Sequence, residues 1–208
     1  MQEKIGELIR NWQKRNIEGV YCDNKNQAHN SILELIPESA SVGFCGSQTL
    51  EQLEIIEMLE TRGNKVFNQY ASNLSRDESM IVRKLGGQAD YYLASANAIS
   101  LQGELVFFSA YGHRIAGIAD AKRVIVVCGL NKITPNLEEA IKRARNYVTP
   151  LNCKRLRWDT PCLKDGICHN YECLAPEFNR MCCQILILES EVASGRMTVI
   201  IVGEELGF

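Results

Sequence analysis

The apolar positions of the first part of the chain recur with a helical period. They follow this spacing from Ile5 to Trp12 and again over residues 25–36, where Pro37 ends the pattern. Proline lacks the amide hydrogen that a helix interior requires, so the second helix is expected to stop there. Residues 1–36 are therefore predicted to form an N-terminal helical segment.

From residue 40 onward, short apolar strands alternate with amphipathic helices. The strongest strand, 124–129, is a continuous apolar run, which is typical of a central strand buried on both faces. This alternation predicts an α/β fold with a mainly parallel sheet. Further strands are predicted at 19–22, 40–44, 65–68, 89–94 and 105–108, and helices at 50–62, 76–85 and 136–147.

The end of the chain has a different pattern. Two apolar runs, 184–189 and 196–202, flank the turn residues Ser194 and Gly195, which predicts a β-hairpin. We expect one domain over 1–208. Its parts are the helical segment 1–36, an α/β core over 40–150, a cysteine-rich loop over 151–183 and the hairpin over 184–208.

Composition narrows the class of protein. The chain has 208 residues, a net charge of −2, 46% hydrophobic and 23% charged residues, values typical of one globular domain and not of a disordered chain. The balanced charge argues against nucleic acid as a partner. No apolar run approaches the roughly 18 residues that a membrane span requires. The start lacks the apolar core of a signal peptide, so we expect a cytoplasmic protein whose nine cysteines are reduced thiols.

A glycine-containing turn follows the strand predicted at 40–44. Backbone amides at such a turn, with hydroxyl side chains, suit phosphate or carboxylate. The turn lacks the lysine of a P-loop, and the alternative is an ordinary strand–helix turn in which Ser47 caps the helix. Its candidate ligand-binding residues are Gly43, Gly46, Ser47, Gln48 and Thr49.

Polar residues follow three other predicted strands. In open α/β sheets, ligands bind beyond the carboxyl ends of the strands, so these residues could converge with the turn on one pocket for a small anionic metabolite. Each also has a structural alternative, such as a satisfied turn or a solvated surface charge. They are Asn97, His113, Arg114, Asn131 and Lys132.

Five of the nine cysteines crowd into the segment 162–183. Four thiolates can hold zinc or an iron–sulfur cluster, and Cys162, Cys168, Cys173 and Cys182 are the candidate ligands. Cys183 could be a fifth ligand, and His169 could replace one sulfur. The spacing is irregular and contains no C-x-x-C pair, so a set of free thiols is the alternative.

Several motifs together resemble the LUD-domain (lactate-utilisation) family, over the whole chain. They are the segments 46–50, 95–99, 103–106, 112–116, 129–133, 150–156 and 199–208. The resemblance implies a three-layer α/β/α, Rossmann-like fold similar to ribose-phosphate isomerases, glucosamine-phosphate deaminases and CoA transferases. It also implies a role in bacterial L-lactate oxidation, where partner subunits carry iron–sulfur clusters. Cys45 and His113 depart from the family pattern, where we expect glycine and asparagine.

Three functions follow as hypotheses. The first is a subunit or accessory protein of L-lactate or other 2-hydroxy-acid oxidation, with an iron–sulfur or metal site at the four cysteines. The second is an independent enzyme or binding protein for a phosphorylated, carboxylated or CoA-linked metabolite. The third is a cysteine-based redox-sensing module. The sequence leaves self-association into a homo-oligomer open.

Overall fold

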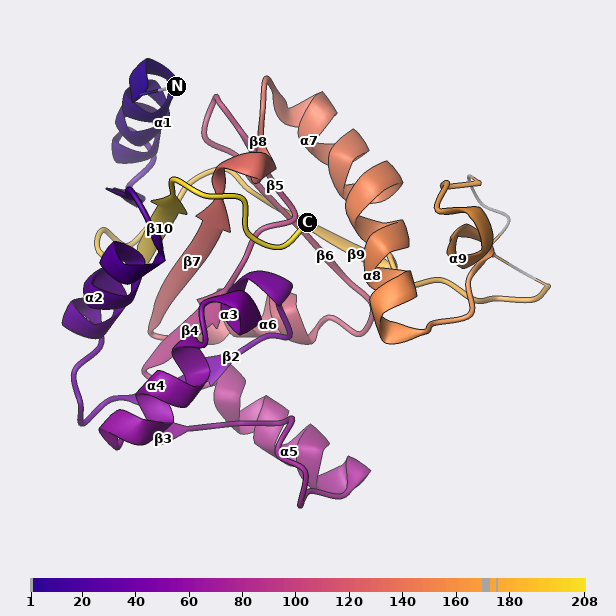
Figure 1. The fold of residues 1–208 in the computed structure, drawn as a ribbon, viewed down its shortest axis with the longest axis horizontal. Helices are drawn as coiled ribbons and strands as arrows, with labels where there is room; N and C mark the ends of the chain where they lie inside the picture. The colour runs from indigo at the N-terminus through magenta and orange to yellow at the C-terminus, as the bar shows by residue number, and fades with distance from the viewer. Residues whose placement is uncertain (1, 170–172, 175) are drawn as a thin grey trace.

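A six-stranded parallel sheet forms the centre of the molecule, in a computed structural model that describes residues 2–169, 173–174 and 176–208. Its strand order is β1-β10-β7-β4-β2-β3 (Figure 1). Every residue of β10, and all of β7 except Arg123, is buried, as the apolar run at 124–129 predicts. The strands are β1 Glu18–Cys22, β2 Ser41–Phe44, β3 Lys65–Val66, β4 Tyr91–Ala94, β7 Arg123–Gly129 and β10 Met197–Val202.

A second, four-stranded sheet lies beside the first, and the sequence pattern did not separate the two. Its strand order is β8-β5-β6-β9, with β5–β6 and β6–β9 antiparallel and β5–β8 parallel. Ile99, Leu105 and Phe107 of this sheet pack into the same apolar cluster as Val126 and Val199 of the large sheet. The strands are β5 Ala98–Ser100, β6 Leu105–Ser109, β8 Ile133–Thr134 and β9 Gln184–Leu188.

The C-terminal β-hairpin predicted over 184–208 is wrong. Both strands form, but β9 pairs with β6 in the small sheet, whereas β10 lies between β1 and β7 in the large one. Burial explains the difference. All six side chains of β10 are buried, while every residue of β9 keeps some exposure, so the two runs suit different sheets.

Helices cover both faces of the large sheet, which confirms the predicted three-layer arrangement. One face packs against α2 Lys25–Leu35, α3 Gln48–Gln52 and α4 Ile55–Arg62. The other packs against α1 Gln2–Gln13, α6 His113–Asp120 and the small sheet. Helix α5 Arg76–Gly87 contacts β2 and α6. The remaining helical segments are α7 Leu137–Arg143, the π-helical turn Ala144–Val148, α8 Thr149–Leu156 and α9 Pro161–Asp165.

The helix predicted at 50–62 is divided in two. Glu54 has a left-handed backbone (φ 54°) between α3 and α4, although neither glycine nor proline stands there. The helix that follows the glycine turn is therefore the short α3, and not one long helix over 50–62. Among the described helices, none combines the length and apolar character needed to cross a membrane.

Candidate functional site

The glycine turn lies at the carboxyl end of β2, where it enters α3. Ser47 caps α3 by accepting a hydrogen bond from the Leu50 amide (3.4 Å). A Cβ atom at Gly43 would overlap the carbonyl oxygen of Gly86, so Gly43 serves the close approach of α5 to β2. Because α3 has only five residues, the helix dipole adds little at this turn, and any binding must come from side chains.

The most unusual side chain near the turn is Lys132, which is only 4% exposed. It follows β7, in a short 3-10 turn over Leu130–Lys132. Its Nζ atom donates to the hydroxyls of Thr49 and Ser95 (both 2.8 Å) and to the carbonyl of Ala96 (3.2 Å). All three acceptors are neutral. Within the described part of the chain, no carboxylate lies within ion-pair distance of this ammonium.

Burial lowers the pKa of Lys132 to about 8, and the nearby guanidinium groups of Arg143 and Arg114 act in the same direction. A low-dielectric site disfavours the charged form of a lysine, and like charges add to that effect. At neutral pH the group is still mainly an ammonium. The buried ammonium of Lys132 therefore has partners for its hydrogen bonds, but no described carboxylate balances its positive charge.

Arg114 brings a second cation to the same edge of the sheet. It lies in the first turn of α6 and donates to the carbonyl of Gly46 (2.9 Å), to Oδ1 of Asn97 (3.1 Å) and to the carbonyl of Phe108 (3.1 Å). Its Nε atom is buried without a hydrogen-bond partner. Arg114 also forms no ion pair with a described carboxylate. These bonds hold its guanidinium beside the glycine turn.

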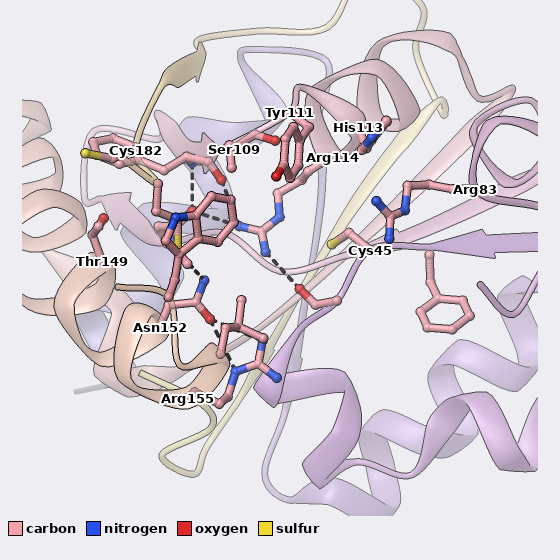
Figure 2. Close-up of a pocket in the computed structure, with 18 of the residues that line it drawn as sticks. Cys45, Arg83, Ser109, Tyr111, His113, Arg114, Thr149, Asn152, Arg155 and Cys182 are labelled. Atoms are coloured by element: carbon pink, nitrogen blue, oxygen red, sulfur yellow. Dashed lines mark hydrogen bonds between the residues drawn. The ribbon is translucent and has the colours of Figure 1, made fainter. Parts of the chain in front are cut away.

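Two connected hollows open around these cations. A recess of about 30 Å³ is bordered by Ser47, Thr49, Ser95 and Lys132. A cavity of about 440 Å³ adjoins it (Figure 2). Residues that line both are Gly46, Asn97, Arg114, Asn152 and Arg155. Residues that line the cavity and not the recess include Phe44, Cys45, Tyr70, Arg83, Tyr111, His113, Trp158 and Met181.

The predicted binding residues divide between these hollows and the scaffold. Gln48 lines the recess together with Ser47, Thr49, Asn97 and Lys132. His113 lines the cavity, where burial lowers its pKa and the nearby Arg83 and Lys84 lower it further. Gly43 and Asn131 lie outside both hollows. Asn131 instead ties down the end of the chain, through Leu206 and Gly207.

Several cavity residues were not predicted from the sequence. Asn152 and Arg155 come from α8, and Arg155 pairs with Glu51 (3.1 Å). Figure 2 shows Arg114, Asn152 and Arg155 extending toward one another from α6 and α8. Helix α8 does not directly follow a strand, so the rule that ligands bind at the carboxyl ends of strands could not identify its residues. The only signal was their place in the segment 150–156.

The cysteine-rich segment forms a third, smaller hollow of about 20 Å³ behind the cavity. Five cysteines line it: Cys153, Cys162, Cys168, Cys173 and Cys182, with His169. The predicted ligands are thus neighbours, and the buried Cys153 joins them with its Sγ atom 3.9 Å from that of Cys162. Burial raises the pKa of Cys153 to about 12. Thr149, Met181 and Cys182 line both this hollow and the cavity.

Thiolates are suitable donors for zinc or an iron–sulfur cluster, but their positions here do not form a ligand set. Across the described ranges, no three His, Cys, Asp or Glu residues are grouped so as to hold a metal ion. His169 instead lies 2.6 Å from the carboxylate of Asp165, and Cys173 accepts from Arg180 (3.5 Å). As arranged, these residues do not fit a bound metal.

Comparison with known proteins identifies the family. The LUD-domain model matches residues 5–202, so the chain belongs to the LUD-domain family. A DUF162 family protein from Deinococcus radiodurans is similar over 97% of this chain and 94% of that chain, with 11% identity and a TM-score of 0.47. Ribose 5-phosphate isomerase from Plasmodium falciparum is similar over 53% and 52%, with 19% identity and a TM-score of 0.34. No curated protein matches the chain.

Proposed function

We propose that this LUD-domain protein binds a small anionic metabolite, phosphorylated or carboxylated, where the recess meets the cavity. The buried ammonium of Lys132, which no described carboxylate balances, carries the proposal. Burying an ion costs several kcal/mol unless an opposite charge offsets it. An anion held between Lys132 and Arg114 would supply that charge, and the hydroxyl of Ser47, which accepts from the Leu50 amide and keeps its own proton, would donate a further hydrogen bond.

A thermal-shift screen of sugar phosphates, 2-hydroxy acids and CoA esters tests this binding. We expect at least one of these anions to stabilise the wild-type protein. The shift should be lost in Lys132→Met, which keeps the length of the side chain and removes the charge. Lys122→Met is the matched control, because Lys122 is exposed and pairs with Asp90 away from the site. A shift that survives in Lys132→Met would contradict the proposal.

The biological role we propose is that of a subunit or accessory protein in bacterial oxidation of L-lactate or another 2-hydroxy acid. Membership of the LUD-domain family supports this role. Its partners would be subunits that carry iron–sulfur clusters. Co-purification from cells grown on L-lactate tests the association. Recovery of the protein without any iron-containing partner under those conditions would contradict it.

An independent enzyme for a phosphorylated, carboxylated or CoA-linked metabolite is the second candidate function. No Asp or Glu is among the described residues that line the recess, which disfavours acid–base chemistry by a side-chain carboxylate there. However, Lys132, with its pKa near 8, is placed to exchange a proton with a bound ligand. Turnover of any compound found in the thermal-shift screen would favour this candidate over a pure binding role.

A metal or redox role for the cysteine-rich segment is a separate part of the proposal. We propose a cytoplasmic location, where the nine thiols would stay reduced. Four of those around the third hollow, Cys162, Cys168, Cys173 and Cys182, would have to move closer together to bind zinc or an iron–sulfur cluster. The close pair Cys153 and Cys162 supports redox sensing as the alternative.

A further inference from the structure

The size of the cavity does not match a small hydroxy acid. Its volume of about 440 Å³ falls within the range of about 300–1,000 Å³ that is typical of sites for larger, drug-sized ligands. A three-carbon acid or a phosphate group would fill only a small part of this cavity. The cavity therefore has room for a second chemical group attached to the anion.

Several aromatic side chains line the cavity. The rings of Tyr111 and Trp158 have centroids 5.7 Å apart, and those of Phe44 and Tyr70 are 5.9 Å apart. Tyr111 and Tyr70 are 66% and 57% exposed, although both line the cavity. Rings that are not buried in the core keep faces available for stacking. A planar aromatic group is the ligand chemistry that such a lining favours.

The charged side chains of the cavity are mainly cationic. Arg83, Arg114 and Arg155 line it, and Glu51, which is already paired with Arg155, is the carboxylate among its described lining residues. Arg114 and Arg155 stand where the cavity meets the recess. Guanidinium groups bind phosphate through paired hydrogen bonds. A phosphate attached to a larger ligand in the cavity would therefore meet two guanidinium groups at this junction.

We propose that the ligand of this site is a nucleotide. Its base stacks among Tyr70, Tyr111 and Trp158, and its phosphate lies at the junction formed by Arg114 and Arg155, within reach of the Lys132 recess. This inference rests on the proposed anion binding and adds the aromatic half of the ligand. Flavin and adenine mononucleotides share the required chemistry, and separate titrations distinguish them.

Calorimetric titration of the full chain with AMP, FMN, ribose 5-phosphate and inorganic phosphate tests the inference. We expect AMP or FMN to bind at least about tenfold more tightly than ribose 5-phosphate, because base–aromatic stacking contributes binding energy of that order. Binding should also quench the fluorescence of Trp158. The other tryptophan, Trp12, is buried and donates to the carbonyl of Gly103, away from the cavity.

Variants separate the two halves of the site. Trp158→Leu and Tyr111→Leu should weaken the nucleotide about tenfold and leave ribose 5-phosphate unchanged. Tyr147→Leu is the matched control, since Tyr147 is exposed outside the cavity and stacks on Arg143. If the nucleotide binds no more tightly than ribose 5-phosphate, the nucleotide inference fails and anion binding stands. If the nucleotide binds but Lys132→Met leaves it unaffected, the proposed role of the recess fails instead.

Discussion

The ammonium of Lys132 lies 2.8 Å from the hydroxyl of Thr49, which precedes it by 83 residues in the chain. This contact joins the start of α3, which follows β2, to the turn after β7. The hydroxyl of Ser95, which follows β4, completes the group (2.8 Å). The carboxyl ends of three parallel strands therefore meet at one buried positive charge.

The ionisation of Lys132 should appear in the pH dependence of stability. Its pKa is about 8 in the folded protein against an ordinary value of 10.5, so between these values the unfolded chain binds more protons at this residue. The Lys132 contribution to the unfolding free energy therefore rises as pH increases from about 8 to 10.5. Denaturant titrations should show wild type gaining stability relative to Lys132→Met over that interval. A constant difference would contradict the lowered pKa.

Anion binding should weaken over the same pH range. Above about pH 8 Lys132 loses its charge, so the affinity for inorganic phosphate should fall as the pH increases further. Arg114 keeps its charge, which leaves residual binding. Titration calorimetry at pH 7 and pH 9 measures the change, and the affinities are compared per phosphate dianion because inorganic phosphate is only partly doubly charged at pH 7. Equal affinities would show that the ammonium does not contact the anion.

Gly43 should be intolerant of any side chain. A Cβ atom there would overlap the backbone of Gly86, so Gly43→Ala forces α5 away from β2. We expect a loss of about 3 kcal/mol or more in the unfolding free energy. Gly6→Ala is the control: this helical position has only the end of the Arg10 side chain nearby (3.4 Å), and alanine there should stabilise α1 by up to about 1 kcal/mol. Chemical denaturation that finds the two variants equally stable would refute the packing argument.

Cys153 and Cys162 should form a disulfide under mild oxidation. Their sulfur atoms are 3.9 Å apart, and diamide would accept the two electrons and two protons released. The reaction should be slow at neutral pH, since the pKa of Cys153 is raised to about 12. Mass spectrometry of unreduced peptides should recover this crosslink, with the buried Cys22 and Cys128 still reduced. Persistent free thiols at both positions would exclude a redox role for this pair.

Metal binding by the cysteine-rich segment has its own test. Iron, zinc and acid-labile sulfide are measured after anaerobic purification, and a metal held by this segment would be lost when Cys162 and Cys168 are changed to serine. Cys22→Ser, which alters a buried thiol beside Ser31, is the control. A fully folded wild-type protein without metal under these conditions would remove the metal proposal. Anion binding at Lys132 would be unaffected by that result.

Much of the fold was predictable because burial leaves a direct signature in the sequence. The apolar run at 124–129 predicts a central strand, and β7 lies between β10 and β4. The choice of which strands pair with each other left no such signature in the sequence. The turn residues Ser194 and Gly195 indicate a change of direction equally well whether the flanking strands pair with each other or, as here, enter two different sheets. The break at Glu54 likewise has no glycine or proline to mark it.

The site was predictable where it depends on topology. Polar residues after parallel strands reach the same edge of the sheet, which is how Thr49 and Lys132 come into contact. The aromatic side of the cavity depends on the tertiary position of α8 and the segment after it, which bring in Arg155 and Trp158. Local sequence patterns do not encode that placement.

Calorimetric titration of inorganic phosphate and L-lactate into wild type, Lys132→Met and Lys122→Met tests the central claim most directly. The account predicts that wild type and Lys122→Met bind at least one of these anions, and that Lys132→Met binds it about thirtyfold more weakly or worse, as expected when a buried charge pair is lost. Equal affinity in all three proteins, or no binding by wild type, would contradict the claim that the Lys132 ammonium is the charge that an anionic ligand balances.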